Sequence, residues 1–208
     1  MNRFLLFFCF ISISLVFSQN FDAGILAGIN TSQVSGDNLS GFNKLGVKIG
    51  GFVSREFNAF NAQLELQYIN KGSRNMTDDD THQEQYKFQL NYIQIPCLIK
   101  TSIYKNTFVE FGASIAYLLN WTEKYYGYED RGIDVNKLEY NINVGVDYKI
   151  NRYLHLNTRL SNSIVPIRPH ASGKTHKWNK GQYNTCLSFV LCYYFNKKLK
   201  NSSLRTRE

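Results

Sequence analysis

The chain has 208 residues, a formal net charge of +8 and 15% aromatic residues, but only three prolines. This length is enough for one domain of ordinary size and not for two. Beyond Asn20 the cysteines are Cys97, Cys186 and Cys192. Their odd number, without CxxC spacing, argues against a disulfide framework and against a zinc site.

The N-terminal segment has the three-part pattern of a secretory signal peptide: Arg3, an apolar run from Phe4 to Phe17, and Ser18 before the cleavage point. We therefore predict that residues 1–18 form a signal peptide that is cleaved. The apolar run is shorter than the about 20 residues of a membrane-spanning helix. For a secreted chain, nucleic acid is a poor partner for the positive charge, and anionic lipid or lipopolysaccharide phosphate is a better one.

Apolar and polar residues then alternate with a period of two, which is typical of β-strands. In Tyr183 to Phe195 the odd positions are largely apolar and the even positions small or polar. Most runs suit the roughly 9–11 residues that a tilted strand needs to cross a membrane. The predicted strands are residues 21–30, 45–54, 60–71, 86–100, 107–121, 140–150, 152–163 and 183–195.

The fourth run departs from this alternation. From Phe88 to Tyr92 the even positions are apolar, whereas from Ile93 onward the odd positions are apolar. A switch of parity followed by Pro96 is typical of a β-bulge, so we expect a bulge near Tyr92 and Ile93.

The predicted connections alternate strictly in length. Those at 57–58, 102–106 and 150–151 are short, and those at 31–44, 72–85, 122–136 and 165–181 are long and polar. Bacterial outer-membrane barrels have tight periplasmic turns and long extracellular loops, with an even number of strands. We therefore predict an all-β fold, an eight-stranded antiparallel up-and-down transmembrane β-barrel, over residues 19–196. Both termini are expected in the periplasm, with residues 197–208 as a basic, disordered periplasmic tail.

The charged face of these strands must point into the barrel, because a Lys or Arg facing lipid at mid-depth costs about 2–4 kcal/mol. If the turn at 150–151 is tight, Asp147 lies opposite His155 and Asn143 opposite Arg159. Lys48 and Gly50 are expected near Glu65 and Gln67. The predicted polar network of the lumen consists of Lys48, Glu65, Gln67, Glu110, Asn143, Asp147, Lys149, His155 and Arg159.

Aromatic residues near the strand ends are candidates for the belts that outer-membrane barrels place at the membrane–water interfaces. The predicted interface aromatics are Tyr92, Tyr117, Trp121, Tyr148, Tyr153, Tyr183 and Tyr193.

Four segments carry a family resemblance: AGINTSQVSGD, GFVSREF, LELQYINKGS and LNYIQIPCLIK. They resemble the PorT-like outer-membrane β-barrels of Bacteroidota-type bacteria, in which a first strand ends in Gly-x-Asn, as Gly28-Ile29-Asn30 does here. The resemblance implies a location in the outer membrane of a Gram-negative bacterium, and the founding member of that family serves protein secretion. Two departures are Gln94, where the family often has Glu, and the basic tail after Phe195.

We expect no catalytic residue, metal or cofactor. An Asp147–His155 pair could orient a base, Asp78 to Asp80 could bind Ca²⁺, and His170 with His176 could bind a transition metal, but each fits a structural or solvated role better.

The predicted function is a structural, adhesive or accessory barrel without an open pore. Its expected partners are outer-membrane lipids, lipopolysaccharide and the barrel-assembly machinery, with other envelope proteins as further candidates. The alternatives are an accessory component of protein secretion, a lipid-modifying barrel enzyme and a soluble lipocalin-like binder.

Overall fold

A computed structural model describes residues 21–36, 41–75, 85–130, 132–170 and 181–195 of the chain. The predicted signal peptide and basic tail lie outside the described residues. No helix within the described ranges is long and apolar enough to cross a membrane. The strands are β1 (Phe21–Ser35), β2 (Lys44–Glu56), β3 (Asn61–Asn75), β4 (Tyr86–Tyr104), β5 (Thr107–Tyr125), β6 (Tyr128–Glu129), β7 (Leu138–Lys149), β8 (Leu154–Ser163) and β9 (Tyr183–Tyr194).

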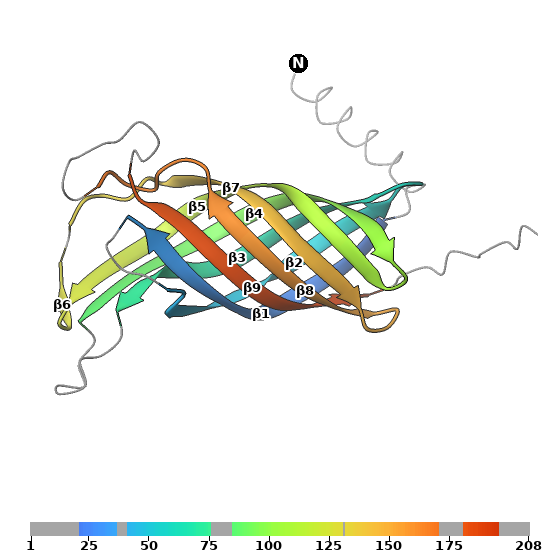
Figure 1. Ribbon diagram of the computed structural model, residues 1–208, viewed down its shortest axis with the longest axis horizontal. Helices are drawn as coiled ribbons and strands as arrows, with labels where there is room; N and C mark the ends of the chain where they lie inside the picture. Colours follow the sequence, from blue (N-terminus) through green and yellow to red (C-terminus); the bar gives the residue numbers. More distant parts are fainter. Residues whose placement is uncertain (1–20, 37–40, 76–84, 131, 171–180, 196–208) are drawn as a thin grey trace, which may run out of the picture.

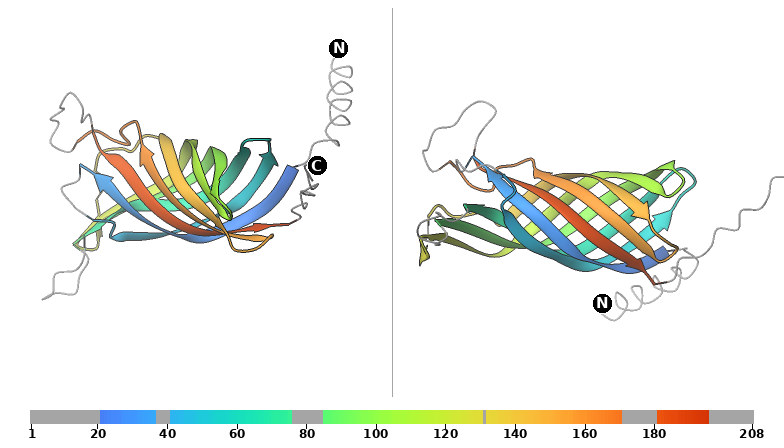
Figure 2. Two further views of the ribbon diagram at one scale, coloured as in Figure 1. Left: turned by 45° about the vertical axis from the view of Figure 1, so that its right-hand side comes forward. Right: turned by 60° about the horizontal axis from the view of Figure 1, so that its bottom comes forward.

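Eight of these strands close into a barrel (Figures 1 and 2). Each pairs antiparallel with its neighbour along the chain, and β1 pairs with β9 to close the ring. The ninth, β6, is a two-residue strand that pairs only with the end of β5. The predicted all-β, eight-stranded antiparallel barrel is therefore confirmed, and each of its predicted strands is present.

The two faces of the barrel wall have opposite chemistry. Outward-facing side chains such as Ile29, Leu66 and Ile115 are 56%, 58% and 52% exposed, whereas the inward-facing positions are dominated by buried polar and charged residues. An apolar exterior around a polar interior reverses the arrangement of a water-soluble protein and is that of a transmembrane barrel. The structure thus contradicts the lipocalin-like alternative, which requires an apolar interior and a polar exterior.

Strand β4 corrects one expectation of the sequence. Its even positions point inward without interruption from Tyr86 to Lys100, so there is no switch of parity at Tyr92. The irregularity lies in the partner strand: Asn91 pairs with Asn120 and Tyr92 with Leu118, so the extra residue belongs to β5. Tyr92 is accordingly 0% exposed inside the barrel, and its prediction as an interface aromatic is wrong.

One part of the wall continues beyond the rest at the end with the long connections. The β2–β3 ladder ends at Lys48 and Ile69, and the β5–β7 ladder ends at Tyr117 and Leu138. Pairing of β4 with both β3 and β5 continues as far as Tyr86. We call residues 70–75 of β3, 86–91 of β4 and 119–125 of β5, with β6, the strand extension (Figure 1).

Side chains of β1 support the free flank of this extension. Asn30 Nδ2 donates to the Asn70 carbonyl at 2.8 Å, and the Gly72 amide donates to Ser32 Oγ at 2.9 Å. These bonds satisfy β3 backbone groups above the point where its ladder with β2 ends. Asn30 belongs to the Gly28-Ile29-Asn30 motif, and this contact gives that motif a structural role.

Candidate functional site

The centre of the barrel holds a buried ionic cluster of one arginine and two glutamates. Arg159 of β8 donates from Nη1 and Nη2 to the two carboxylate oxygens of Glu65 in β3, at 2.7 and 2.8 Å. Its Nε donates to Glu110 Oε1 of β5 at 2.6 Å. Gly145, the register partner of Arg159, leaves the space, since a Cβ there would lie 2.6 Å from Glu110 Oε1. All three charged groups are satisfied within the cluster, as burial of charge requires.

A second cluster lies nearer the short turns. Lys100 Nζ is 2.8 Å from Asp147 Oδ2, and His155 Nδ1 is 2.6 Å from Asp147 Oδ1. Lys100 also lies 3.4 Å from Glu110, which links this cluster to the central one. The ring centroids of His155 and Tyr194 are 4.6 Å apart. Next to them is a small group of buried apolar and aromatic side chains: Leu26, Phe52, Val190, Cys192 and Tyr194.

Between the central cluster and the end with the long connections, the lumen contains first a layer of uncharged polar side chains and then a further ion pair. Ser114 Oγ accepts from Gln94 Nε2 at 2.5 Å and from Asn143 Nδ2 at 3.0 Å, and so bridges two strands. Beyond this, Lys71 Nζ lies 2.6 Å from Glu139 Oε1, and both side chains are 0% exposed. The polar interior is therefore built as successive hydrogen-bonded layers rather than as one open channel.

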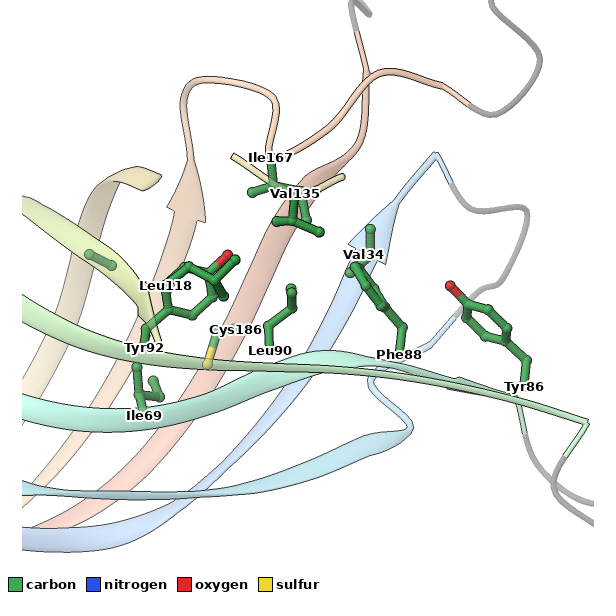
Figure 3. Close-up of a cluster of buried hydrophobic side chains, with 11 residues drawn as sticks. Val34, Ile69, Tyr86, Phe88, Leu90, Tyr92, Leu118, Val135, Ile167 and Cys186 are labelled. Carbon is green, nitrogen blue, oxygen red and sulfur yellow. The ribbon is translucent and has the colours of Figure 1, made fainter. Parts of the chain in front are cut away.

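An apolar cluster closes the end with the long connections (Figure 3). The side chains of Tyr86, Phe88, Leu90 and Tyr92 point from the inner face of β4 into this end of the barrel. Trp121 packs against the cluster at its edge. The buried members are Val34, Ile69, Tyr86, Phe88, Leu90, Tyr92, Ala116, Leu118, Val135, Ile167 and Cys186.

Arg168 fastens the connection after β8 to the strand extension. Its Nη1 and Nη2 donate to Glu123 at 2.6 and 2.9 Å, and its guanidinium lies 4.2 Å from the centroid of the Phe88 ring. Tyr86 Oη donates to the same carboxylate at 2.7 Å. Burial opposes the charged form of Glu123, but the hydrogen bonds from Arg168 and Tyr86 outweigh it and hold its pKa below the usual value. Burial, together with the bond to Glu123, raises the pKa of Tyr86.

The structure places the predicted lumen residues as follows. Eight of them are buried inside the barrel: Lys48, Glu65, Gln67, Glu110, Asn143, Asp147, His155 and Arg159. Lys149, at the turn end of β7, is only partly buried and is the register partner of His155.

Two of the predicted pairings are wrong. Asp147 lies opposite Asn157, and Arg159 lies opposite Gly145 rather than Asn143. The turn is longer than predicted: Asn151 Oδ1 accepts from the Tyr153 and Leu154 amides, and the register pairs of β7 and β8 begin only at Lys149 and His155. The His155 side chain nevertheless reaches Asp147 diagonally.

The predicted positions on β2 and β3 are correct only in part. Gly50 is the register partner of Gln67, but Lys48 lies opposite Ile69 and Glu65 lies opposite Phe52. Lys48 Nζ also approaches Ser188 Oγ of β9 at 3.4 Å.

The predicted interface aromatics divide into three groups. Tyr117, Tyr148 and Tyr193 point outward and are about half exposed, whereas Tyr92 is inside. Trp121 is partly buried against the apolar cluster. Tyr153 and Tyr183, at strand ends, are also partly buried. A position at the membrane–water interface stays a prediction for the outward-facing tyrosines.

Among the described residues, sequence reasoning missed six buried charged side chains: Lys44, Lys71, Lys100, Glu123, Glu139 and Arg168. Lys71 shares the parity of Glu65 and Gln67, and Lys100 shares that of the inward face of β4, so alternation alone could have identified both. Glu139 lies just before a predicted strand. Lys44, Glu123 and Arg168 fall in segments that the sequence predicts to be long connections, where alternation gives no signal.

Within the described ranges, no group of three His, Cys, Asp or Glu side chains is placed to hold a metal ion. Asp78 to Asp80 and His176 lie outside those ranges.

An open cavity of about 780 Å³ lies between residues 118–123 of β5 and residues 134–137, beside Trp121.

A closed, apolar-faced antiparallel ring of eight strands defines the class: a small outer-membrane β-barrel. Residues 17–167 match the family described as outer membrane protein beta-barrel domain, and the chain belongs to that family. It is located in the outer membrane of a Gram-negative bacterium. No curated protein matches the chain.

Solved structures that share the fold include those of two bacterial surface proteins. Ail, the attachment invasion locus protein of Yersinia pestis, has 11% sequence identity and a TM-score of 0.50, with 85% of this chain and 100% of that chain covered. Neisserial surface protein A has 12% identity and a TM-score of 0.56, with 84% of this chain and 99% of that chain covered. At these identities the likeness is one of fold.

Proposed function

We propose that the protein is a non-conducting outer-membrane barrel with a structural or adhesive role, in which the lumen serves stability rather than transport. The observation that carries this is the filling of the interior from one end to the other. An eight-stranded barrel is just wide enough inside for its own side chains. Here the apolar cluster, the hydrogen-bonded polar layer and the two ionic clusters occupy that space in succession.

The outward display of side chains at the strand extension supports an adhesive role. Tyr126, in the tight turn after β5, and Tyr128, the first residue of β6, are 60% and 81% exposed. Exposed tyrosines on a rigid element supply large contact area at low entropic cost. The Arg168–Glu123 contact fixes the element that carries them. Ail is the attachment invasion locus protein of Yersinia pestis, and we extend an adhesive role to this chain as part of the proposal.

The positions of the chain ends and of the strand extension support an orientation of the barrel in the membrane. β1 begins and β9 ends at the end with the short turns, while the extension lies at the other end (Figure 1). In bacterial barrels the short turns face the periplasm. Both termini are therefore proposed to be periplasmic, as delivery by the barrel-assembly machinery requires, and the extension is proposed to face the outside.

The two alternative functions, a lipid-modifying enzyme and a component of protein secretion, have less support. The Asp147–His155 pair is held by Lys100 and covered by Tyr194, so we propose a structural role for it and no enzymatic activity. The Gly28-Ile29-Asn30 and Asn91-to-Lys100 motifs support a PorT-like affiliation, and normal secretion by a deletion strain would exclude the associated secretion role.

Conductance across a planar lipid bilayer tests the proposal. The refolded protein is expected to give no stable open-channel steps, because side chains fill the path. The matched variant, Glu65→Ala with Glu110→Ala and Arg159→Ala, removes the central cluster while leaving the ladder intact. This variant is expected to conduct more ion current across the bilayer than the parent protein. Stable channels in the parent protein would overturn the proposal.

A further inference from the structure

The cavity beside Trp121 lies where β5 has a gap in its hydrogen bonding. On this edge, the ladder of β5 with β7 ends at Tyr117, and the ladder with β6 begins only at Lys124. The Glu123 carbonyl accepts from the Asp130 amide at 3.0 Å on the same edge. Because every second residue of a strand directs its backbone groups to the same edge, the amide and carbonyl of Trp121 also point there. Within the described ranges they have no backbone partner, so this part of the wall offers hydrogen-bonding groups to a ligand.

The cavity has the size and the lining of a small-molecule site. Its volume is about 780 Å³, within the range of about 300–1,000 Å³ that is usual for ligand sites. Leu118 and Val135, two buried members of the apolar cluster, form part of its wall (Figure 3). The Trp121 ring packs against that cluster and also lines the cavity. Polar side chains complete the lining, among them Asn120, Thr122, Asp130, Asp134, Asn136 and Lys137.

Two asparagines of the lining are held in place and carry complementary groups for a ligand. Asn120 Oδ1 accepts from Asn91 Nδ2 at 2.5 Å, which leaves Asn120 Nδ2 as a donor. Asn136 Nδ2 donates to the Pro166 carbonyl at 2.9 Å, which leaves Asn136 Oδ1 as an acceptor. Because each amide is fixed at one end, less side-chain entropy is lost when the other end binds a ligand. The cavity therefore offers one preorganised donor and one preorganised acceptor.

The charges of the lining favour a neutral ligand. In the described part of the chain, no cation pairs with Asp130 or Asp134. Both carboxylates are acceptors only, whereas Lys137, on the same lining, is a donor only. The two carboxylates oppose an anion, and the lysine opposes a cation. A sugar hydroxyl both donates and accepts, so a ligand with several hydroxyls matches this set of groups.

The Trp121 ring favours a sugar among the neutral ligands. The face of an aromatic ring is electron-rich and attracts groups with partial positive charge. A pyranose presents such C–H groups on its face and its hydroxyls around its edge. When a pyranose stacks on Trp121, its hydroxyls are directed toward the polar side chains that surround the ring.

The cavity begins where the apolar exterior of β5 ends. Leu119, which is 50% exposed, is the last aliphatic residue of this strand, and the outward-facing Asn120 and Thr122 that follow are polar and exposed. A polar ligand therefore reaches the cavity beyond the surface that faces lipid.

We infer that the cavity between β5 and residues 134–137 binds a neutral pyranose oligosaccharide, which stacks on Trp121 and hydrogen-bonds to the surrounding amides and carboxylates. The inference rests on the adhesive role proposed above and names the partner in that role as a glycan. It does not require a closed lumen. Glycan binding by a conducting barrel would overturn only the absence of conductance, and a closed barrel that binds no glycan would overturn only this inference.

The test is a glycan array probed with the purified, folded and fluorescently labelled barrel in a zwitterionic detergent that has no sugar headgroup. The array carries neutral oligosaccharides of animal cell surfaces, bacterial core oligosaccharides, and sialylated or sulfated forms of the same sugars. Neutral oligosaccharides are expected to bind, and their acidic forms to bind more weakly because of repulsion by Asp130 and Asp134. The source of the bound sugars assigns the partner to another cell or to the outer leaflet itself. Binding to no oligosaccharide, or stronger binding of the sulfated forms, would overturn the inference.

Titration of a bound oligosaccharide against variants locates the site. Trp121→Ala is expected to bind it at least about tenfold more weakly, because the stacking surface is lost. Asp130→Asn combined with Asp134→Asn is expected to lose about tenfold, because hydrogen bonds to charged groups are the stronger ones. These two exposed side chains have no partner in the described structure to lose, so this variant covers the case in which Trp121→Ala does not fold. Heat-modifiable gel mobility monitors folding.

The matched controls lie at the opposite end of the barrel. Tyr104→Ala removes an aromatic side chain that is 67% exposed, and Glu56→Gln removes an exposed carboxylate. Both are expected to bind like the parent. Unchanged affinity in the Trp121 variant and in the double aspartate variant would overturn the inference. A loss confined to Tyr126→Ala with Tyr128→Ala would also overturn it, because it would place the contact on the exposed tyrosines.

Discussion

Arg159 of β8 and Glu65 of β3 are joined by two hydrogen bonds, of 2.7 and 2.8 Å, across 94 residues of sequence. In the closed ring three strands separate β3 from β8 in either direction. The pair therefore spans the full width of the barrel at its centre. A contact of this kind ties opposite walls together and occupies the path that a solute would need.

Removing the arginine of this pair is expected to destabilise the barrel strongly. Arg159→Met removes the guanidinium that neutralises Glu65 and leaves Glu110 with Lys100 at 3.4 Å, and breaking a buried pair typically costs about 3–5 kcal/mol. Urea-induced unfolding in lipid vesicles, followed by heat-modifiable gel mobility, measures the loss. Adding Glu65→Gln and Glu110→Gln should restore part of it. Unchanged stability of Arg159→Met would show that the cluster contributes little.

Gly145 is expected to tolerate no side chain. A Cβ at this position would lie 2.6 Å from both Glu110 Oε1 and the Thr158 carbonyl. Gly145→Ala should therefore cost about 1–3 kcal/mol, the usual range for overpacking, in the same urea experiment. The control is Gly51→Ala, where the nearest atom would be 3.6 Å from the new Cβ. Similar unfolding midpoints for the two variants would contradict this account of Gly145.

The Ser32 hydroxyl is expected to protect the backbone of the extension. It accepts from the Gly72 amide at 2.9 Å and donates to the Gly72 carbonyl at 3.0 Å. Ser32→Ala should speed hydrogen exchange at Gly72 and cost about 1–3 kcal/mol, because two backbone groups lose their partner. Exchange at Gln67, within the β2–β3 ladder, serves as the internal control and should stay slow. Unaltered exchange at Gly72 would show that the hydroxyl is dispensable.

Acid is expected to loosen the extension before it unfolds the barrel. The pKa of Glu123 is lowered in the folded state because hydrogen bonds from Arg168 and Tyr86 overcome the effect of burial. Its contribution to stability is therefore present above the unfolded-state pKa of about 4.3 and is lost as the pH falls through the folded-state value. Trp121 fluorescence should change over this acid range, and Glu123→Gln should remove the change. A transition that persists in Glu123→Gln would assign it to another group.

The sequence was sufficient for the strands and for most of their faces, because alternation is a local property. Lys48, Glu65 and Arg159 could be assigned to the interior on the cost of exposing charge to lipid alone. Tyr92 could not, because its apolar neighbours on the same face suggested a lipid contact. In the structure those neighbours fill the interior above the polar layers. An apolar cluster inside a barrel has the same sequence pattern as an apolar face outside it.

The pairings were harder to predict than the faces. The partner of Asp147 depends on how many residues the turn before Leu154 uses, and the Asn151 side chain decides this by capping two amides. The Arg168–Glu123 contact joins two segments outside the alternating pattern, 45 residues apart. Such contacts follow from three-dimensional closure of the barrel, which no local period encodes.

Labelling of the native cysteines tests the filled interior most directly. Cys186 and Cys192 face the lumen toward its two ends and are each 2% exposed. A small, water-soluble maleimide added to the folded barrel in vesicles should label neither of them, although both should react fully after unfolding in urea. Labelling of both thiols in the folded protein as fast as in the unfolded one would mean that water and solutes pass through the lumen, and would contradict the account.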